Sequence, residues 1–230
     1  MYYSKEIIIY LQSNNILALK LDHAFTGVGK AVSDQIDMIG AGVQRAMYYT
    51  SCFTDEYQEI CQQQKVEDLR FTKGVYQLIS HGNIVNDMLK IYFEDVFKYK
   101  TLSQLQRIKK SLMVVNIHIA ASYLTQHGFS LAVAAAVSVG MKMSLDMNAL
   151  VGLKAGAVAA LAGMYGVVQK AADSANRLRY ALPGYYSALY ANELEMMFFL
   201  IDPLFERSGA LRSAWASDDE ISRVITNMIW

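Results

Sequence analysis

The chain has 230 residues, of which 53% are hydrophobic and 18% charged, with 21 basic and 21 acidic residues. A charged share of about 25% is usual in soluble domains, so the composition leans towards membrane-active proteins, and the balanced charge argues against nucleic-acid binding. Only two prolines occur, whereas a β-rich chain needs more turn-forming residues. We therefore expect an all-α fold, a compact bundle of about eight to ten helices in a single domain over residues 1–230.

The first part of the chain predicts three helical segments, at 7–21, 22–49 and 53–80, the last of them amphipathic. The third segment has apolar residues at Ile60, Val66, Leu69, Val75, Leu78 and Ile79. The N-terminal apolar run is short, contains Glu6 and lacks a small-residue cleavage site, so we expect no cleaved signal peptide.

Two cysteines, Cys52 and Cys61, complete the N-terminal part. Nine residues along one helix would place them on opposite faces. We therefore expect no disulfide between them and no metal site, but two thiols that suit a reducing compartment.

The middle of the chain carries the clearest local signals. Residues 84–98 show an apolar stripe with helical spacing. Thr101 and Gln104 have the spacing of a capping box, which predicts that a helix starts there and runs to about His127. Further along, Pro183 is expected to end one helix, residues 185–201 to form another, and Asp202-Pro203 to break it. Ser217 and Glu220 predict a second capping box for the last helix.

A charge-poor region occupies the stretch between these signals. From Ser111 to Gln169 only Lys142, Asp146 and Lys154 are formally charged. The pattern predicts a hydrophobic helical hairpin at about 120–168, with arms at 120–141 and 147–168. Each arm is close to the roughly 20 residues needed to span a bilayer. The residues expected to enter the membrane are Phe129, Leu131, Val133, Val137, Val139, Leu150, Val151, Leu153, Val158, Leu161 and Val167.

Small residues recur along the second arm at steps of three and four, and this spacing allows close approach of helix backbones in lipid. They are Gly152, Gly156, Ala159, Gly163 and Gly166. We expect them to contact the small residues of the first arm, Ala132, Ala135, Ala136 and Gly140. The hairpin tip is flanked by Lys142, Asp146, Asn148 and Lys154, and each charge at the bilayer centre would cost about 2.5–3.5 kcal/mol.

The hairpin pattern has three interpretations. It can be the permanent buried pair of a bundle, because a helix that is apolar on all sides is typical of a core. It can be a two-span membrane anchor. It can also be a hairpin that is buried first and inserted later, and its Ala- and Val-rich composition suits both environments.

A helical chain around an Ala-, Gly- and Val-rich hairpin at Phe129 to Val168 resembles the pore-forming bacterial toxins of the colicin type. It also resembles the small ion-selective pore effectors of type VI secretion. About 60 residues follow the hairpin, unlike in colicins, and we expect no receptor-binding or translocation domain. The resemblance implies membrane depolarisation and a cognate immunity protein.

The resulting prediction is an antibacterial pore-forming toxin that is not an enzyme and has no cofactor or metal. It would be made in the bacterial cytoplasm, exported by a specialised secretion system, and active at the target cell's inner membrane. Expected partners are the lipid bilayer, an immunity protein, a secretion-system carrier or chaperone, and further copies of the chain in the membrane. The alternative is a soluble helical interaction protein, an adaptor or immunity partner, whose hairpin stays in the core.

Other candidate sites are weaker. A hydrolase using Glu193, Glu195 and Asp202 has no supporting arrangement in the sequence. The scattered histidines, such as His118 and His127, are expected to be ordinary polar groups or pH sensors. The basic residues before the first arm are expected to form a solvated face or to attract anionic headgroups; they are Lys98, Lys100, Arg107, Lys109 and Lys110.

Overall fold

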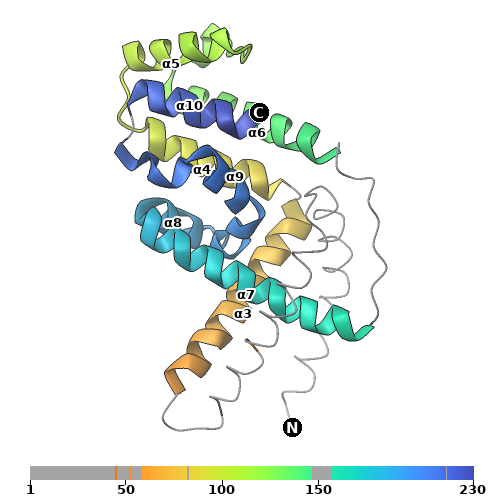
Figure 1. Ribbon diagram of the computed structural model, residues 1–230. Coiled ribbons are helices and arrows are strands. Elements are labelled where there is room, and N and C mark those ends of the chain that lie inside the picture. The colour runs from red at the N-terminus through yellow and green to blue at the C-terminus, as the bar shows by residue number, and fades with distance from the viewer. Residues whose placement is uncertain (1–44, 46–51, 53–57, 82, 147–156, 216) are drawn as a thin grey trace. The chain divides into compact units, whose positions relative to one another are not determined.

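The computed structural model describes residues 45 and 52 and the ranges 58–81, 83–146, 157–215 and 217–230 (Figure 1). Within these ranges the side chains of 79–81, 141–146, 157–165 and 213–215 are not described. All regular elements in the described ranges are helices, so the all-α prediction is confirmed. The helices expected at 7–21 and 22–49 lie outside the described residues.

The chain forms two compact units, and their boundaries fall inside three helices. Unit 1 comprises residues 1–71 and 144–172, and unit 2 comprises residues 72–143 and 173–230. The helices that cross the boundaries are α3 (Gln58–His81), α6 (Gln126–Asp146) and α7 (Ala157–Ala181). Each unit is described by itself below.

In unit 1 the described part of α3 buries a different face from the one predicted. Ile60, Val66 and Leu69 are exposed, with 39%, 52% and 59% of their surfaces accessible. The buried positions are Cys61, Gln64 and Phe71. The predicted apolar face is therefore wrong in this part of α3, because a buried cysteine and a buried glutamine interrupt the hydrophobic spacing, whereas Val75, further along the helix, is buried as predicted.

Unit 2 begins with the last part of α3, followed by α4 (Ile84–Phe97) and α5 (Leu102–Val114). The α4 stripe is confirmed, because Met88, Leu89, Tyr92, Phe93 and Phe97 are all buried. The Thr101 side chain accepts from the Gln104 N–H, and the Gln104 side chain accepts from the Thr101 N–H. The predicted capping box therefore starts α5, since it satisfies backbone groups that have no partner within the helix.

The helix that starts at Thr101 is shorter than predicted. α5 ends at Val114, a short 3-10 helix, η3 (Ala121–Tyr123), follows, and α6 starts at Gln126. Asn116 has φ 62°, a left-handed conformation that stops a helix. Ile117 and Ile119 are buried while His118 is exposed, so alternating burial in an extended stretch replaces the expected helical spacing.

The C-terminal half of unit 2 also departs from the prediction for 185–201. α8 (Pro183–Ala191) is followed by a turn in which Glu193 has φ 58° and then by η4 (Glu195–Leu200). The break predicted at Asp202-Pro203 is confirmed, because η4 ends at Leu200, and the same pair also starts α9 (Asp202–Ser208), since proline fits the first helical turn. After η5 (Ala210–Trp215), the predicted Ser217–Glu220 capping box opens α10 (Asp218–Ile229).

Aromatic rings fill the core of unit 2. Tyr92, on α4, packs edge-to-face on Tyr185, on α8, and on Phe205, on α9, with ring centroids 5.4 and 4.7 Å apart. Phe198, on η4, packs on Phe205 at 5.1 Å, and the Tyr185 hydroxyl donates to the Met88 carbonyl at 2.9 Å. Burial raises the pKa of Tyr185 well above its ordinary value. α4, α8, η4 and α9 therefore share one aromatic core.

Candidate functional site

The first apolar arm lies mainly in α6, which places one face of the helix in the core of unit 2. Phe129, Val133 and Val137 are fully buried, Leu131 is half-buried, and Val139 is 57% exposed. The buried residues are four apart, so they lie on one side of the helix. In the part that the structure describes, one face of the first arm is thus buried, and the more open face is also apolar, at Leu131, Ala135 and Val139.

Two elements cover the buried face of α6. Phe129 packs edge-to-face on Phe97, on α4, with ring centroids 5.0 Å apart, and the Ser130 hydroxyl donates to the Phe93 carbonyl at 3.1 Å. Near the other end, a Cβ built on Gly140 would lie 3.0 Å from the carbonyl oxygen of Ile229, on α10. Glycine at position 140 therefore lets α10 approach the α6 backbone closely.

This contact differs from the predicted pairing of the two arms. The three nearest atoms around Gly140 all belong to Ile229, and Ala135 is exposed. The first arm up to Met143 belongs to unit 2, whereas residues 144–172 belong to unit 1. The structure does not confirm a central hairpin, because Gly140 meets α10 and the side chains of 141–165 are outside the described ones.

The second arm is described only from residue 157 onward. The predicted positions Leu150, Val151, Leu153, Gly152, Gly156, Asn148 and Lys154 lie outside the described residues. Val158, Ala159, Leu161 and Gly163 fall within α7, and Lys142 and Asp146 within α6, at positions without described side chains. Gly166 is buried and Val167 half-buried. The predicted small-residue stripe is thus described only at its last member.

None of the described helices combines the length and the apolar character needed to cross a membrane. The break between α5 and α6 divides the charge-free run from Ser111 to Met141 into shorter pieces.

The start of α10 is tied to α5 by an ion-pair cluster. The Lys100 ammonium donates to Asp218 Oδ1 at 3.0 Å, and Arg107 donates to Asp218 Oδ2 from Nη2 at 2.8 Å and from Nε at 3.1 Å. Burial raises the pKa of Asp218, but the bonds from Lys100 and Arg107 outweigh it, so the net pKa is lowered. The carboxylate also suits the first turn of α10, where the helix dipole is positive.

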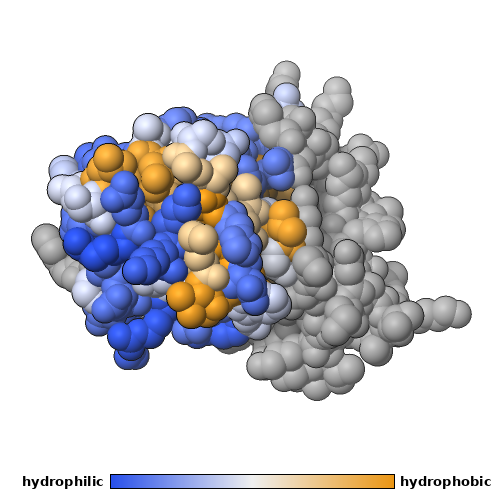
Figure 2. All heavy atoms as spheres, turned by 90° about the horizontal axis from the view of Figure 1, so that it is seen from above, coloured by the Kyte–Doolittle hydropathy of each residue, from blue (hydrophilic) through white to orange (hydrophobic). Residues whose placement is uncertain are grey.

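The other basic residues before the first arm are at least partly exposed to solvent. Lys98 and Lys110 are exposed and Lys109 is half-buried. Figure 2 views unit 2 from the α5 side of Figure 1 and shows apolar groups separated by hydrophilic ones. Exposed apolar residues on α5 include Leu102 and Val114. The predicted solvated basic face therefore also contains apolar side chains.

Unit 1 holds a buried arginine that joins two helices. Arg45 is 0% exposed. Its Nη1 donates to Glu67 Oε2 at 3.0 Å and to Gln169 Oε1 at 3.2 Å, and its Nη2 donates to the Gln64 carbonyl at 3.2 Å and to Asp68 Oδ1 at 2.5 Å. Arg45, Gln64, Glu67, Asp68 and Gln169 are called the Arg45 cluster below. Burial raises the pKa of Asp68, and the nearby Arg45 charge offsets only part of that rise.

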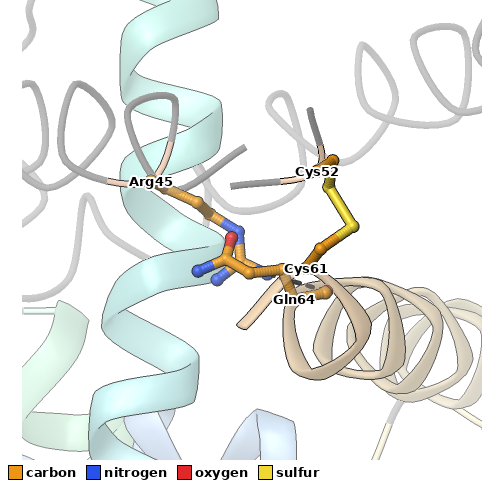
Figure 3. The surroundings of a disulfide bond; sticks show 4 residues. All are labelled: Arg45, Cys52, Cys61 and Gln64. Atoms are coloured by element: carbon orange, nitrogen blue, oxygen red, sulfur yellow. Dashed lines mark hydrogen bonds between the residues drawn. A yellow bond between two sulfur atoms is a disulfide. The ribbon is translucent and has the colours of Figure 1, made fainter. Parts of the chain in front are cut away.

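A disulfide joins Cys52 to Cys61 beside this cluster, with an S–S distance of 2.08 Å (Figure 3). The prediction of free thiols was therefore wrong. Its premise was a single helix containing both cysteines. Nine residues of one helix would place their Cα atoms about 13 Å apart, but these atoms lie 5.0 Å apart, so the helical spacing does not apply.

The three acids considered for hydrolysis have different surroundings. Glu193 pairs with Lys73 at 2.5 Å. Asp202 accepts from the Ser174 hydroxyl at 2.6 Å and from Arg177, which also pairs with Glu206. Glu195 is 2% exposed. Glu193 and Asp202 thus take part in ion pairs with nearby basic residues, and no group of potential metal ligands occurs among the described residues.

Sequence reasoning missed the Arg45 cluster, although one signal pointed to it. Arg45 is the only formally charged residue between Asp37 and Asp55. A lone charge in an apolar segment that packs into a core must be paired there. The sequence also contained a signal for the ion pairs of Asp218 with Lys100 and Arg107, because Asp218 directly follows the N-cap Ser217 of the predicted capping box.

Comparisons with protein-family models, with curated proteins and with solved structures find no match to this chain.

Proposed function

We propose that this protein is an antibacterial pore-forming effector that inserts its apolar arms into a target cell's inner membrane and dissipates ion gradients. The single observation that carries this proposal is the stretch from Ser111 to Gln169, in which only Lys142, Asp146 and Lys154 are charged. Such a length of nearly uncharged chain, rich in Ala, Gly and Val, suits a segment that moves from a protein core into lipid.

The packing of α6 supports this proposal. Its buried residues are Phe129, Val133, Ala134 and Val137, together with the small polar residues Ser130 and Ser138. The aromatic core of unit 2 is built by α4, α8, η4 and α9. Movement of α6 would expose apolar surface to the bilayer and leave these aromatic pairs in place, so unit 2 can serve as a scaffold from which the arm departs.

The disulfide supports action outside a reducing compartment. Disulfides persist in secreted and periplasmic proteins and are rare in the cytosol. A chain made in the cytoplasm, exported by a specialised secretion system and delivered to the periplasmic side of an inner membrane would meet oxidising conditions there. Before export, a carrier or chaperone and a cognate immunity protein would cover the apolar arms.

The mechanism is ion leakage without catalysis or cofactor. After insertion, Lys142, Asp146 and Lys154 must cross the bilayer or line a wet path, because a charge at the bilayer centre costs about 2.5–3.5 kcal/mol. Two spans alone enclose no pore, so further helices of the chain or further copies of it would complete the wall.

The test is single-channel current across a planar bilayer after addition of purified protein, compared with a Val139→Lys variant. Val139 is 57% exposed in the folded protein, so a lysine there leaves the fold intact but places a charge inside the first arm. We expect discrete conductance steps for the unaltered protein and their loss in the variant. Val114→Lys is the matched control, because Val114 is 81% exposed and lies before the arm.

The second candidate is a helical interaction protein, an adaptor or immunity partner. It is favoured by the absence of a membrane-spanning candidate among the described helices and by the burial of α6 in unit 2. In that case the bilayer stays silent for all three proteins over a range of pH, voltage and anionic lipid content.

A further inference from the structure

The disulfide and the Arg45 cluster lie on one face of α3. Cys61, Gln64 and Asp68 follow one another at steps of three and four, so they lie along one side of the helix. Cys61 is 1% exposed and Gln64 is 5% exposed. Figure 3 shows the Arg45 side chain directed towards the part of α3 that carries Cys61 and Gln64. The disulfide therefore attaches Cys52, seven residues after Arg45, next to the site that receives the guanidinium.

Arg45 links α3 to α7 within unit 1. Nη1 bonds both to Glu67, on α3, and to Gln169, on α7. Gln169 is itself 7% exposed, and its neighbours Val168, Ala171 and Ala172 are buried. The guanidinium thus connects a polar face of α3 to Gln169, a single polar residue among buried apolar ones on α7.

The hydrogen bonds within the Arg45 cluster leave two of its buried polar atoms without a partner. Arg45 Nε and Gln64 Oε1 are both buried without a hydrogen-bond partner. A buried polar atom that has given up water without finding a partner weakens the folded state. A buried charge with imperfect pairing also recovers little of its desolvation cost. The free energy gained by pairing Arg45 in this cluster is therefore close to the cost of burying it. A nearby covalent restraint can then determine whether the arginine stays in the cluster.

We propose that the Cys52–Cys61 pair is a redox switch, in which disulfide formation keeps Arg45 in its cluster and reduction releases the α3–α7 connection in unit 1. The disulfide acts by restricting the open chain, since a cross-link removes conformations in which Cys52, and Arg45 with it, lies away from α3. This inference goes beyond the proposed function and does not depend on pore formation.

The chemistry is ordinary thiol–disulfide exchange. Cys52 is partly exposed while Cys61 is buried, so a reducing thiolate attacks the Cys52 sulfur, the S–S bond breaks, and Cys61 leaves as a thiolate that takes up a proton. A second thiol then resolves the mixed disulfide on Cys52. In sum, two external thiols become one disulfide and both cysteines become thiols. Reoxidation uses a small-molecule or protein disulfide as oxidant and reverses each step.

The test is amide hydrogen exchange, read by mass spectrometry on the full chain before and after reduction with a phosphine. We expect residues 61–71 and 166–172 to exchange about tenfold faster or more in the reduced protein, because closing a short loop by a disulfide commonly shifts a local opening equilibrium at least that far. Residues 84–97 and 218–229, in unit 2, are the internal control and should keep their exchange rates.

Two variants separate the role of Arg45 from that of the disulfide. Arg45→Met with the disulfide intact should reproduce the faster exchange of 61–71 and 166–172, and reduction should then add little. Cys52→Ala/Cys61→Ala should behave as the reduced protein does. Unchanged exchange on reduction would overturn the proposal, and so would an equal acceleration in both units or an oxidised Arg45→Met protein that exchanges as the unaltered protein does.

Discussion

Gly140, on α6, lies directly against Ile229, at the end of α10. A Cβ atom built on Gly140 would lie 3.0 Å from the Ile229 carbonyl oxygen and 3.2 Å from its Cα. Two of these nearest atoms belong to the backbone, so a side chain at position 140 cannot be accommodated by a change of rotamer. The contact fixes how closely the first apolar arm and the last helix approach within unit 2.

Gly140→Ala is expected to destabilise the protein by about 1–3 kcal/mol, because overpacking moves backbone at the α6–α10 contact. The measurement is the free energy of unfolding from urea titration. Gly184→Ala is the matched control, since the nearest atom to its added Cβ would be Asp95 Oδ2 at 3.9 Å, and it should leave stability unchanged or raise it slightly. A Gly140→Ala protein as stable as the unaltered one would contradict the contact.

Asp218→Asn is expected to lower stability by about 1–2 kcal/mol at neutral pH, because it removes a carboxylate bonded by Lys100 and Arg107. The lowered pKa of Asp218 means that its contribution is complete above the ordinary carboxyl range and disappears as pH falls through the lower folded-state value. The stability difference between the two proteins should therefore hold from pH 7 to about pH 5 and shrink below about pH 4. A difference that persists at pH 2 would show that the loss is not electrostatic.

Ser217→Ala removes the N-cap of α10 and should cost about 0.5–2 kcal/mol. It should also raise the pKa of Glu220 part of the way back to its ordinary value. The Ser217 backbone N–H, which lowers that pKa most, still donates in the variant, whereas the hydroxyl no longer does. Carboxyl titration by NMR follows Glu220 directly. Thr101→Ala, at the other capping box, should leave the Glu220 titration unchanged and thus serves as the control.

Arg45→Met should destabilise unit 1 by about 3–5 kcal/mol, because the carboxylates of Glu67 and Asp68 lose their buried partner. The pKa of Asp68, already raised by burial, should rise further when the arginine charge is gone. Adding Asp68→Asn to Arg45→Met should restore part of the loss, measured as a double-mutant cycle by urea unfolding. Additive losses in the double variant would argue against the pairing.

Local chemistry explains which parts of the fold the sequence predicted well. The capping boxes at Thr101 and Ser217 need only residues three apart, and both form as predicted. The α4 stripe likewise depends on spacing within one helix. All-α architecture followed from composition and is confirmed.

The predictions that were wrong concern features that depend on the tertiary environment. Asn116 and Glu193 adopt positive φ and end segments whose residues would also suit a longer helix. Cys52 meets Cys61 because Cys52 lies before α3, which the spacing of the two residues did not reveal. A small-residue pattern shows that another helix can approach Gly140 closely, but it does not show which helix. In the structure the neighbouring helix is α10 and not the second apolar arm.

The most direct test of pore formation is bilayer current from a protein in which α6 is covalently held to α10. Val139→Cys with Trp230→Cys places exposed thiols directly beside Gly140 and Ile229, and a short bismaleimide with an internal disulfide joins them, the cross-link being verified by mass spectrometry before use. Our account predicts no conductance for the cross-linked protein and recovery after reduction, with the unaltered protein and the Val139→Cys single variant conducting in both conditions. Equal conductance with the cross-link in place would contradict the claim that the first arm leaves unit 2 to enter the membrane.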